Sequence, residues 1–326
     1  TASKMFCACA NNFADKPNTN VCPVCLAHPG TLPMPNKSAI EKCLLLGLAL
    51  DCQINKASKF DRKNYFYPDL PKGYQISQYD LPFCHSGKLQ ISHDRHIDIT
   101  RIHLEEDTGK SAHEQNYSAI DFNRAGAPLI ELVTEPVIHD AEEAKKFCQR
   151  FQQTLRYLGI SDADMEKGQM RCEANISLQE SGKWLYEEGQ IKPVGDHQLN
   201  AKVEVKNINS FRAVEKAINF EITRQSKLLD DRQHISPETR GWNDTKNETI
   251  SQRRKETQAD YRYFPEPDIP ALLIDDAWLN EIKNSIVELP HAKALRLRSE
   301  YGFSEADSEL LASDTRLAAF TEELMS

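Results

Sequence analysis

The sequence lacks any long hydrophobic run and both common nucleotide-binding loops. Its longest apolar stretch, Cys43 to Leu50, is far shorter than the roughly 18 apolar residues that a membrane-spanning helix requires. It contains no Gly-x-Gly-x-x-Gly motif. Gly109-Lys110-Ser111 resembles the end of a P-loop, but Leu104 stands where the first glycine of that loop belongs. No membrane span is therefore expected, and a nucleotide site in this chain must have a different design.

Positive charge is in deficit. Forty lysines and arginines against 49 aspartates and glutamates give a net charge of −9. This balance argues against a protein that coats nucleic acid through a broad basic face, and it leaves room for a local basic patch. Arg253, Arg254 and Lys255 form one basic run that is a candidate RNA contact, with a solvated turn as the equal alternative.

The composition is that of a soluble globular protein. The 326 residues are 40% apolar and 27% charged, enough for one large or two ordinary domains. Nine cysteines are an odd number, and most stand singly in apolar patterns, as Cys43 and Cys148 do. A secreted disulfide framework would pair its cysteines, so we expect the protein in the reducing cytosol. The sequence opens at Thr1 without an initiator methionine, and we expect it to be a fragment.

Three segments have the periodicity of amphipathic helices. Ser38 to Glu41 has the form of a capping box, and apolar residues follow it at helical spacing. Asp140 is the expected cap of a second helix, which should end at Gly159. Asn209 or Ser210 is the expected start of a third. The apolar faces of these helices are predicted to be core.

Between the helices, apolar and polar residues alternate with a period of two. This alternation is clearest in residues 169–178 and 202–206, and weaker strand candidates are 97–106, 117–123 and 129–135. The strands come in runs with few intervening helices, which predicts an α+β fold with a mainly antiparallel sheet.

The composition changes near Pro265 to Pro270, and short helical patterns follow from Trp278 onward. We therefore predict a main domain over residues 1–275 and the start of a small helical domain over residues 276–326.

Four cysteines form two tight pairs in a polar loop at residues 7–25. Cys7 and Cys9 are separated by one residue, and Cys22 and Cys25 by two. Four thiolates from two short turns suit the tetrahedral coordination of Zn²⁺ and leave no position for a catalytic water. The pattern predicts a structural zinc site. Four incidental buried cysteines are the alternative, and a redox Cys-x-x-Cys pair lacks the surrounding βαβ pattern.

Carboxylates occupy strand positions from which they are normally depleted, because a half-buried sheet desolvates their charge. Glu173 and Glu204 lie on the polar faces of the two clearest strands, flanked by Arg171, Lys202 and Lys206. A divalent cation with oxygen ligands provides the counter-charge that clustered carboxylates need, and nearby cations would then hold phosphates. A solvated face with salt bridges is the alternative. The other segments carry Glu105, Glu106, Asp121, Glu131 and Glu135.

A series of longer motifs runs through nearly the whole chain. In their order they resemble the B subunits of the tRNA-dependent amidotransferases. The motifs are KFDRKNYFYPD at 59–69, YQISQ at 74–78, RIHLEED at 101–107, DFNRAG at 121–126, RCEAN at 171–175, EVKNINSF at 204–211 and DYRYFPEPD at 260–268.

The resemblance implies a two-step reaction in translation. ATP phosphorylates the side-chain carboxylate of a glutamate or aspartate misacylated on tRNA, and ammonia from a partner amidase then displaces the phosphate to give the amide. Phosphorylation supplies the leaving group that a carboxylate lacks, and Mg²⁺ neutralises charge in the transfer. The implied fold is a cradle likened to glutamine synthetase and the guanidino kinases, followed by helical and tail domains. The implied partners are the misacylated tRNA and two further proteins of a heterotrimer, the amidase (A) and the small (C) subunits.

The resemblance also implies two sets of site residues. The first holds magnesium through its glutamates and serves the activation step, with its lysine near phosphate or substrate. The second contacts the nucleotide or its phosphates, with a sheet-surface ion pair as the alternative for each member. The first set is Glu106, Glu131, Glu173, Glu204 and Lys63, and the second is Arg171, Lys206 and Asn207.

The chain departs from the family pattern in three places. Family members have a Glu-Val-His segment shortly before the position of Thr1 that helps to hold the metal, and a C-terminal tail domain that contacts tRNA. Neither is in this sequence, so we expect poor magnesium binding or inactivity from the chain as given. Where many relatives carry aspartate, this chain has Glu173, which keeps the charge and lengthens the reach.

Three functions are compared. The first is that of a catalytic, ATP-dependent ligase, and the second is that of a noncatalytic, zinc-containing tRNA-docking scaffold of the same complex. The strand carboxylates favour the first, because docking gives no reason to desolvate them. The third, a self-sufficient glutamine amidase, is disfavoured because the sequence has no Ser-Ser-Lys signature and Cys84 lacks a glutaminase context.

Overall fold

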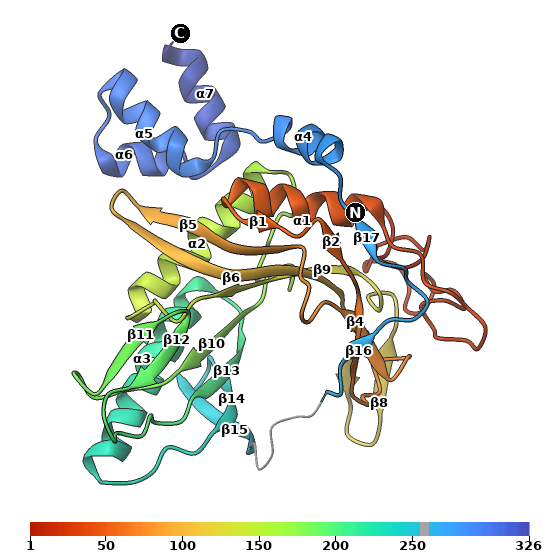
Figure 1. The fold of residues 1–326 in the computed structure, drawn as a ribbon, viewed down its shortest axis with the longest axis horizontal. Coiled ribbons are helices and arrows are strands. Elements are labelled where there is room, and N and C mark those ends of the chain that lie inside the picture. Colours follow the sequence, from red (N-terminus) through yellow and green to blue (C-terminus); the bar gives the residue numbers. More distant parts are fainter. Residues whose placement is uncertain (255–260, 326) are drawn as a thin grey trace. The chain divides into compact units, whose positions relative to one another are not determined.

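A computed structural model of the chain describes residues 1–254 and 261–325, apart from the side chains of Arg253 and Arg254. This part of the chain contains helices α1 to α7 and strands β1 to β17 (Figure 1). Most strand pairs are antiparallel, and the pair formed by β13 (Val203–Ile208) and β14 (Glu238–Asn243) is parallel. The predicted α+β class with mainly antiparallel sheets is confirmed. In the described part, no helix combines the length and the apolar character needed to cross a bilayer.

The chain divides into two compact units, each built from segments that are distant in sequence. The division does not follow the predicted boundary at residue 275, because α4 (Asp276–Asn284) belongs to the first unit and the later helices belong to the second. The first unit comprises Thr1–Lys88, Ile99–Val133 and Asp260–Ile286, and the second comprises Leu89–Asp98, Thr134–Ala259 and Val287–Ser326.

Helix α1 (Lys37–Ala49) begins earlier than its sequence pattern predicts. The side chain of Asn36 accepts a hydrogen bond from the Ala39 backbone N–H at 3.3 Å, so Asn36 is the N-cap and the predicted capping box at Ser38 is wrong. Gly47 lies where the helix approaches Cys84, at the start of a strand. A Cβ at residue 47 would lie 2.3 Å from the Cys84 Sγ, so only glycine permits this approach.

A four-stranded sheet with the strand order β1-β5-β6-β9 belongs mostly to the first unit, and Leu89–Asp98, at the end of β5 and the start of β6, is counted with the second. Several smaller sheets join segments that are far apart in the sequence. One of them pairs β16 with β3 and β3 with β4, and there Arg62 donates two hydrogen bonds to Glu266 at 2.7 and 2.8 Å. The remaining pairs are β2 with β17 and β7 with β8. The bounds are β1 Gln53–Ile54, β2 Ala57–Ser58, β3 Asp61–Asn64, β4 Tyr74–Ser77, β5 Cys84–Ser92, β6 Arg95–Glu106, β7 Lys110–His113, β8 Ser118–Asp121, β9 Pro128–Thr134, β16 Phe264–Pro265 and β17 Leu272–Leu273.

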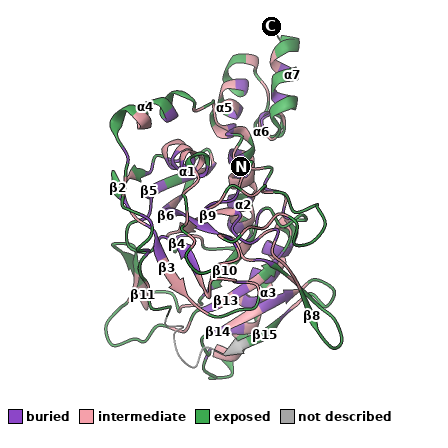
Figure 2. Cartoon of the chain, turned by 90° about the vertical axis from the view of Figure 1, so that its right-hand side faces the viewer, coloured by how far each residue is buried: buried purple, intermediate pink, exposed green. Residues whose placement is uncertain are grey.

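Strand β6 is buried on both faces toward its C-terminal end. Ile102 and Leu104 are fully buried on one face, and His103 and Glu105, on the other, are only 4% and 5% exposed. Buried residues, purple in Figure 2, are concentrated in strands such as β6 and β4, whereas the loops are largely exposed. At the C-terminal end of β6, polar side chains are therefore as deeply buried as apolar ones, although the sequence alternates between the two.

The second unit is built around the sheet β10-β13-β14-β15, against which α3 packs, with α2 against α3. Asp140 caps α2 through the Glu143 N–H at 2.8 Å, and Ser210 caps α3, as predicted. The predicted alternation is confirmed in β10, where exposed residues alternate with less exposed ones, and in the first part of β13, where Val203 and Val205 are buried between less buried neighbours. The bounds are α2 Ala141–Tyr157, β10 Cys172–Ile176, β11 Trp184–Glu187, β12 Gln190–Pro193, α3 Phe211–Asp230, β15 Glu248–Arg254, α5 Pro290–Tyr301, α6 Glu305–Leu311 and α7 Thr315–Met325.

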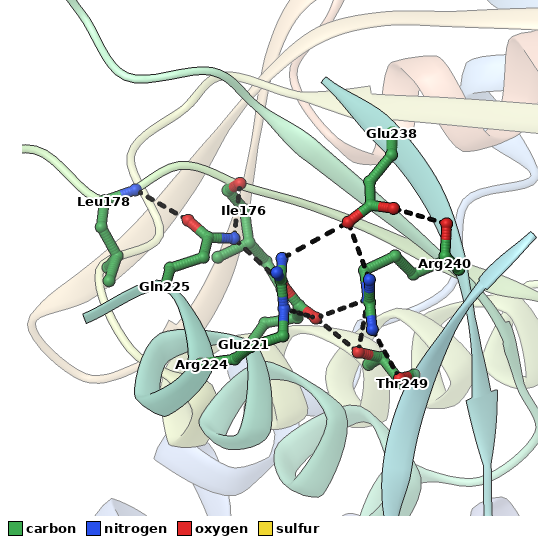
Figure 3. Close-up of polar contacts among 9 residues, drawn as sticks. Ile176, Leu178, Glu221, Arg224, Gln225, Glu238, Arg240 and Thr249 are labelled. Carbon is green, nitrogen blue, oxygen red and sulfur yellow. Dashed lines mark hydrogen bonds and ion pairs between the residues drawn. The ribbon is translucent and has the colours of Figure 1, made fainter. Parts of the chain in front are cut away.

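A buried ionic network joins α3 to strands β14 and β15 (Figure 3). Glu221 is completely buried and accepts hydrogen bonds from Arg224 at 2.9 and 2.7 Å, from Gln225 at 3.1 Å and from Thr249. Arg240 lies 3.2 Å from the Glu221 carboxylate and donates to Glu238 at 2.7 Å. The sequence analysis did not predict this network, which is fully hydrogen-bonded around its central carboxylate.

Replacing Glu221 with Gln should lower the free energy of unfolding by about 3 kcal/mol at neutral pH, because two partly buried arginines lose a fully buried charged partner. Burial raises the pKa of Glu221, but the bonds from Arg224, Thr249 and Gln225 outweigh this, so its pKa is lowered from 4.5. A group with a lowered pKa stabilises the fold above its unfolded pKa and loses this contribution as the pH falls through the folded value. Urea unfolding should therefore show a variant effect that shrinks below about pH 4.5.

Glu215→Gln is the matched control for this experiment. Glu215 lies on the same helix and pairs with Lys145 at 2.6 Å, but both side chains are about one-third exposed. Its loss should cost less than about 1 kcal/mol. Equal effects of the two substitutions would contradict the role assigned to burial at Glu221.

Candidate functional site

The four cysteines of the predicted zinc site come together in the first unit. The Sγ atoms of Cys7, Cys9, Cys22 and Cys25 all lie within 4.8 Å of one another, and those of Cys22 and Cys25 are 3.9 Å apart. Sulfurs bound to one tetrahedral Zn²⁺ at about 2.3 Å are separated by about 3.8 Å. The structure therefore groups the four predicted ligands, and their spacing fits a four-thiolate zinc site without large movement.

A buried lysine supports the charged state of this cluster. Lys4 is completely buried, and its Nζ lies 3.6 Å from the Cys25 Sγ and 3.1 Å from the Phe122 carbonyl. A buried ammonium group needs a nearby anion, which a thiolate at Cys25 provides. The hydrogen bond with Cys7 is the main cause that lowers the pKa of Cys25 to about 4, against burial and with the help of Lys4.

A second group of metal-ligating side chains lies on strands β6 and β9. One ligand atom from each of His103, Glu105 and Glu131 lies within 4.8 Å of the others. His103 and Glu105 are buried, and Glu131 is the partly exposed member. The Nδ1 of His103 is buried without a hydrogen-bond partner in the described residues.

Glu105 is held in its charged form by its surroundings. Burial raises its pKa, but His103, the positive charge of Lys63 and a hydrogen bond from Ser77 outweigh burial, so the pKa of Glu105 lies below its ordinary value. The Ser77 hydroxyl donates to Glu105 at 3.1 Å, and the His103 Nε2 lies 3.8 Å from the same carboxylate. Lys63, predicted to lie near phosphate or substrate, thus acts on the carboxylate group.

Glu106 lies on the opposite face of β6 from Glu105, because side chains alternate along a strand. Its carboxylate accepts a hydrogen bond from the Lys72 Nζ at 2.7 Å and another from the Ile76 N–H at 3.0 Å. Glu106, Lys72 and Cys7 line a cavity of about 160 Å³. The structure therefore groups Glu131 with Glu105, whereas the sequence analysis placed Glu131 in one magnesium-binding set with Glu106, Glu173 and Glu204.

The other predicted carboxylates lie in the second unit. Glu173 and Glu204 both pair with Lys206, at 3.1 and 3.4 Å, and the Thr239 hydroxyl donates to Glu204 at 2.9 Å. Burial lowers the pKa of Lys206, but the two carboxylates outweigh it, so the pKa of Lys206 is raised. The structure brings these three residues together as an ion-paired cluster.

The remaining predicted residues flank this cluster. Arg171 is exposed immediately before β10, and Asn207 on β13 has a positive φ of 62°, which asparagine tolerates better than most residues. In the basic run at residues 253–255, Lys255 lies outside the described residues, as do the side chains of Arg253 and Arg254. That candidate RNA contact stays a prediction.

The sequence analysis missed a cluster of tyrosines beside the carboxylate–histidine group. Tyr79 and Tyr263 are stacked, with ring centroids 4.3 Å apart and planes at 12°. Tyr261 packs edge-on against both Tyr263 and Tyr65, at 6.1 Å in each case. Just before Tyr79 in the chain, the Ser77 hydroxyl donates to Glu105 at 3.1 Å and the Gln78 side chain accepts from the Leu104 N–H at 3.1 Å, which places the cluster beside this end of β6. Burial is the first cause of the raised pKa of Tyr263, and the charges of Glu105 and Glu131 contribute. A signal was available in the tyrosine-rich motifs at 59–69 and 260–268.

Comparison with known proteins finds one family model and many relatives. The model described as the GatB/GatE catalytic domain matches residues 1–280. Three proteins named as B subunits of aspartyl/glutamyl-tRNA(Asn/Gln) amidotransferase align with almost the whole chain. They are 48% identical in Thermoanaerobacter pseudethanolicus over 99% of the chain, 48% in Thermodesulfovibrio yellowstonii over 99%, and 50% in Dehalococcoides mccartyi strain CBDB1 over 100%. The chain spans 66%, 66% and 65% of their respective lengths.

Proposed function

Because the chain belongs to the GatB/GatE catalytic domain family, we propose that it carries the carboxylate-activating site of a tRNA-dependent amidotransferase. In this reaction, ATP phosphorylates the side-chain carboxylate of Glu-tRNA(Gln) or Asp-tRNA(Asn), and ammonia then replaces the phosphate to give the amide. The enzyme class is a carbon–nitrogen ligase with glutamine as the amide donor. The names of the relatives support this class and the tRNA substrate.

The observation that carries the proposal is the grouping of buried His103 and Glu105 with the partly exposed Glu131. Burying carboxylates costs free energy unless a positive charge compensates them, and a docking surface gains nothing from that cost. Lys63 supplies part of the compensation. A family that activates a carboxylate with ATP gives such a group a use, because phosphoryl transfer depends on positioned positive charge.

Glu105 and Glu131 would hold Mg²⁺, for which carboxylate oxygens are suitable ligands. The ion would neutralise charge on the transferred phosphoryl group. We assign His103 to orienting Glu105, because an imidazole nitrogen is a less usual magnesium ligand. Lys63 would attract the phosphates or the substrate carboxylate. The assignment of Glu106 to the metal stays a prediction. Separate substitutions of Glu105 and Glu106 can show which of the two residues binds the metal.

The cluster in the second unit is proposed to serve the nucleotide. Lys206 would contact a phosphate oxygen, with Glu173 and Glu204 holding its ammonium group in place. Arg171 and Asn207 are the further candidates for this contact. The sequence-based assignment of Glu106, Glu131, Glu173 and Glu204 to magnesium stays a prediction.

We also propose a structural zinc at the four cysteines, assembly into a heterotrimer with the amidase (A) and small (C) subunits, and a site of action in the reducing cytosol. The spacing of the Sγ atoms and the buried Lys4 support the zinc. The relatives are named as one component of a larger enzyme, which supports the assembly. None of the nine cysteines, all of which lie in the described residues, forms a disulfide, and a reducing compartment maintains that state. The likeness of the cradle to glutamine synthetase stays a prediction.

The proposal is tested with the full-length protein and its partner proteins, misacylated tRNA, ATP and ammonium. Amidated tRNA and released phosphate should appear together and require ATP. Glu173→Ala and Glu204→Ala should lower the rate of ATP cleavage. Unchanged cleavage in both variants would support the second candidate, a noncatalytic zinc-containing docking scaffold. The exposed side chain of Glu173 is compatible with that candidate.

A further inference from the structure

Four tyrosines form an aromatic surface on the first unit. Tyr79 stacks on Tyr263, Tyr263 contacts Tyr261, and Tyr261 contacts Tyr65. Tyr79 remains 61% exposed although one face of its ring is covered, so its other face is open to solvent. We call these four residues the tyrosine platform.

The platform is fixed in place by backbone hydrogen bonds. Asp61, which is 2% exposed, accepts a hydrogen bond from the Tyr79 N–H at 3.0 Å. The Asn64 N–H donates to the Tyr261 carbonyl at 2.9 Å. The backbone that carries the Tyr79 and Tyr261 rings is therefore hydrogen-bonded to residues of β3. Little conformational entropy would be lost when a flat ligand stacks on these rings.

Two cations border the platform and attract a polyanion. The Lys63 Nζ lies 4.9 Å from the Tyr261 ring centroid. Arg101 lies on the same face of β6 as Glu105, to which Ser77, two residues before Tyr79, donates at 3.1 Å. Within the described part of the chain neither residue forms an ion pair. Cations next to exposed aromatic faces are the combination that binds single-stranded nucleic acid in spite of a net charge of −9.

We propose that the exposed face of Tyr79 stacks the terminal base of the RNA 3′ end that carries the misacylated amino acid. This inference rests on the proposed function and deepens it by naming where the substrate is held. The base and the esterified amino acid are attached to the same ribose. A base held beside Glu105 and Glu131 therefore brings the amino acid to the carboxylate–histidine group.

An RNA end fits the platform better than the adenine of ATP. Small-molecule sites usually enclose most of their ligand in a concave pocket, whereas the open face of Tyr79 covers only one side of a base. The cavity of about 160 Å³ in this unit is lined by none of the four tyrosines. Open aromatic surfaces with neighbouring cations are typical of single-strand binding.

Kinetics of the full-length assembly test the proposal. Tyr79→Ala should raise KM for misacylated tRNA about tenfold, the factor expected for one lost base-stacking contact, and should leave KM for ATP unchanged. Tyr79→Phe keeps the ring and should behave like the wild type. Tyr117→Ala is the control, because Tyr117 is 66% exposed in the β7–β8 hairpin and makes no ring contact among the described residues.

A binding measurement separates this proposal from the proposed function. RNA with 2-aminopurine as its terminal 3′ base should lose fluorescence on binding the wild-type assembly, and Tyr79→Ala should restore the emission. A raised KM for ATP, or unchanged emission, would overturn the stacking proposal. A wild-type assembly that quenches the probe but forms no amide would overturn the proposed function and leave the stacking intact. Thermal unfolding of each variant shows whether it is folded.

Discussion

Glu105→Gln is expected to slow ATP-dependent amidation by on the order of 10³-fold, about 4 kcal/mol in transition-state free energy. The substitution keeps the size of the side chain and removes a charge that is 5% exposed and lies beside His103 and Glu131. The measurement is the single-turnover rate with saturating ammonium, so that the supply of ammonia does not limit it. The Mg²⁺ concentration that gives half the maximal rate should rise as well, because one of two carboxylate ligands is lost.

Glu106→Gln is the decisive comparison. Glu106 is 2% exposed and belongs to the same strand, but it is bound to Lys72 and the Ile76 N–H on the other face. The Glu106→Gln substitution should change the stability of the protein and leave its magnesium requirement near that of the wild type. Glu114→Gln, at an exposed position beside β7, should change neither. A raised magnesium requirement in Glu106→Gln alone would restore the sequence-based assignment and remove Glu105 from the metal.

Local patterns predicted most of the secondary structure because they report on the residues that form it. Asp140 and Ser210 cap their helices as their side-chain chemistry requires. Ser38 failed as a cap because Asn36, two residues earlier, has an equally good side chain and is held by the Ser3 and Lys4 carbonyls. That tertiary contact cannot be seen in the sequence around the helix.

The candidate sites were predictable to different extents. The cysteine group was predictable because the spacing within each pair fixes the geometry of each half. The choice between Glu105 and Glu106 was not, because strand alternation assigns them to opposite faces of the sheet without saying which face Glu131 of the neighbouring strand β9 shares. His103 and Glu105 were harder still, since β6 is buried on both faces and hydrophobic alternation no longer marks its inner side.

The network around Glu221 shows a similar limit in the second unit. A glutamate on α3 with an arginine three residues later looks like an exposed helix pair. Only the pairing of β14 with β15 brings Arg240 and Thr249 to it and buries the carboxylate. Long-range strand register, rather than local propensity, decides the environment of this charge.

Removal of zinc is expected to destabilise the first unit by about 4 kcal/mol or more, the value for a ligand present at a thousandfold its dissociation constant. Without the ion, the Sγ atoms of four cysteines lie within 4.8 Å of one another, and thiolates so close repel each other. Protonating them instead would leave the buried Lys4 ammonium group without its anion at Cys25. Neither state of the empty site is favourable, so the metal and the loop should be lost together.

Cys25→Ser, analysed for metal content and by thermal unfolding, tests this expectation. The wild-type chain should contain about one zinc ion, and the variant should contain little and unfold about 10 °C lower. A strong chelator should give the wild type the same transition as the variant. Cys148→Ala is the control, because Cys148 is 7% exposed, close to the 5% of Cys25. The Cys148→Ala variant should keep the zinc at the four-cysteine site. A metal-free wild type with an unchanged transition would show that hydrogen bonds alone hold the cysteine loop.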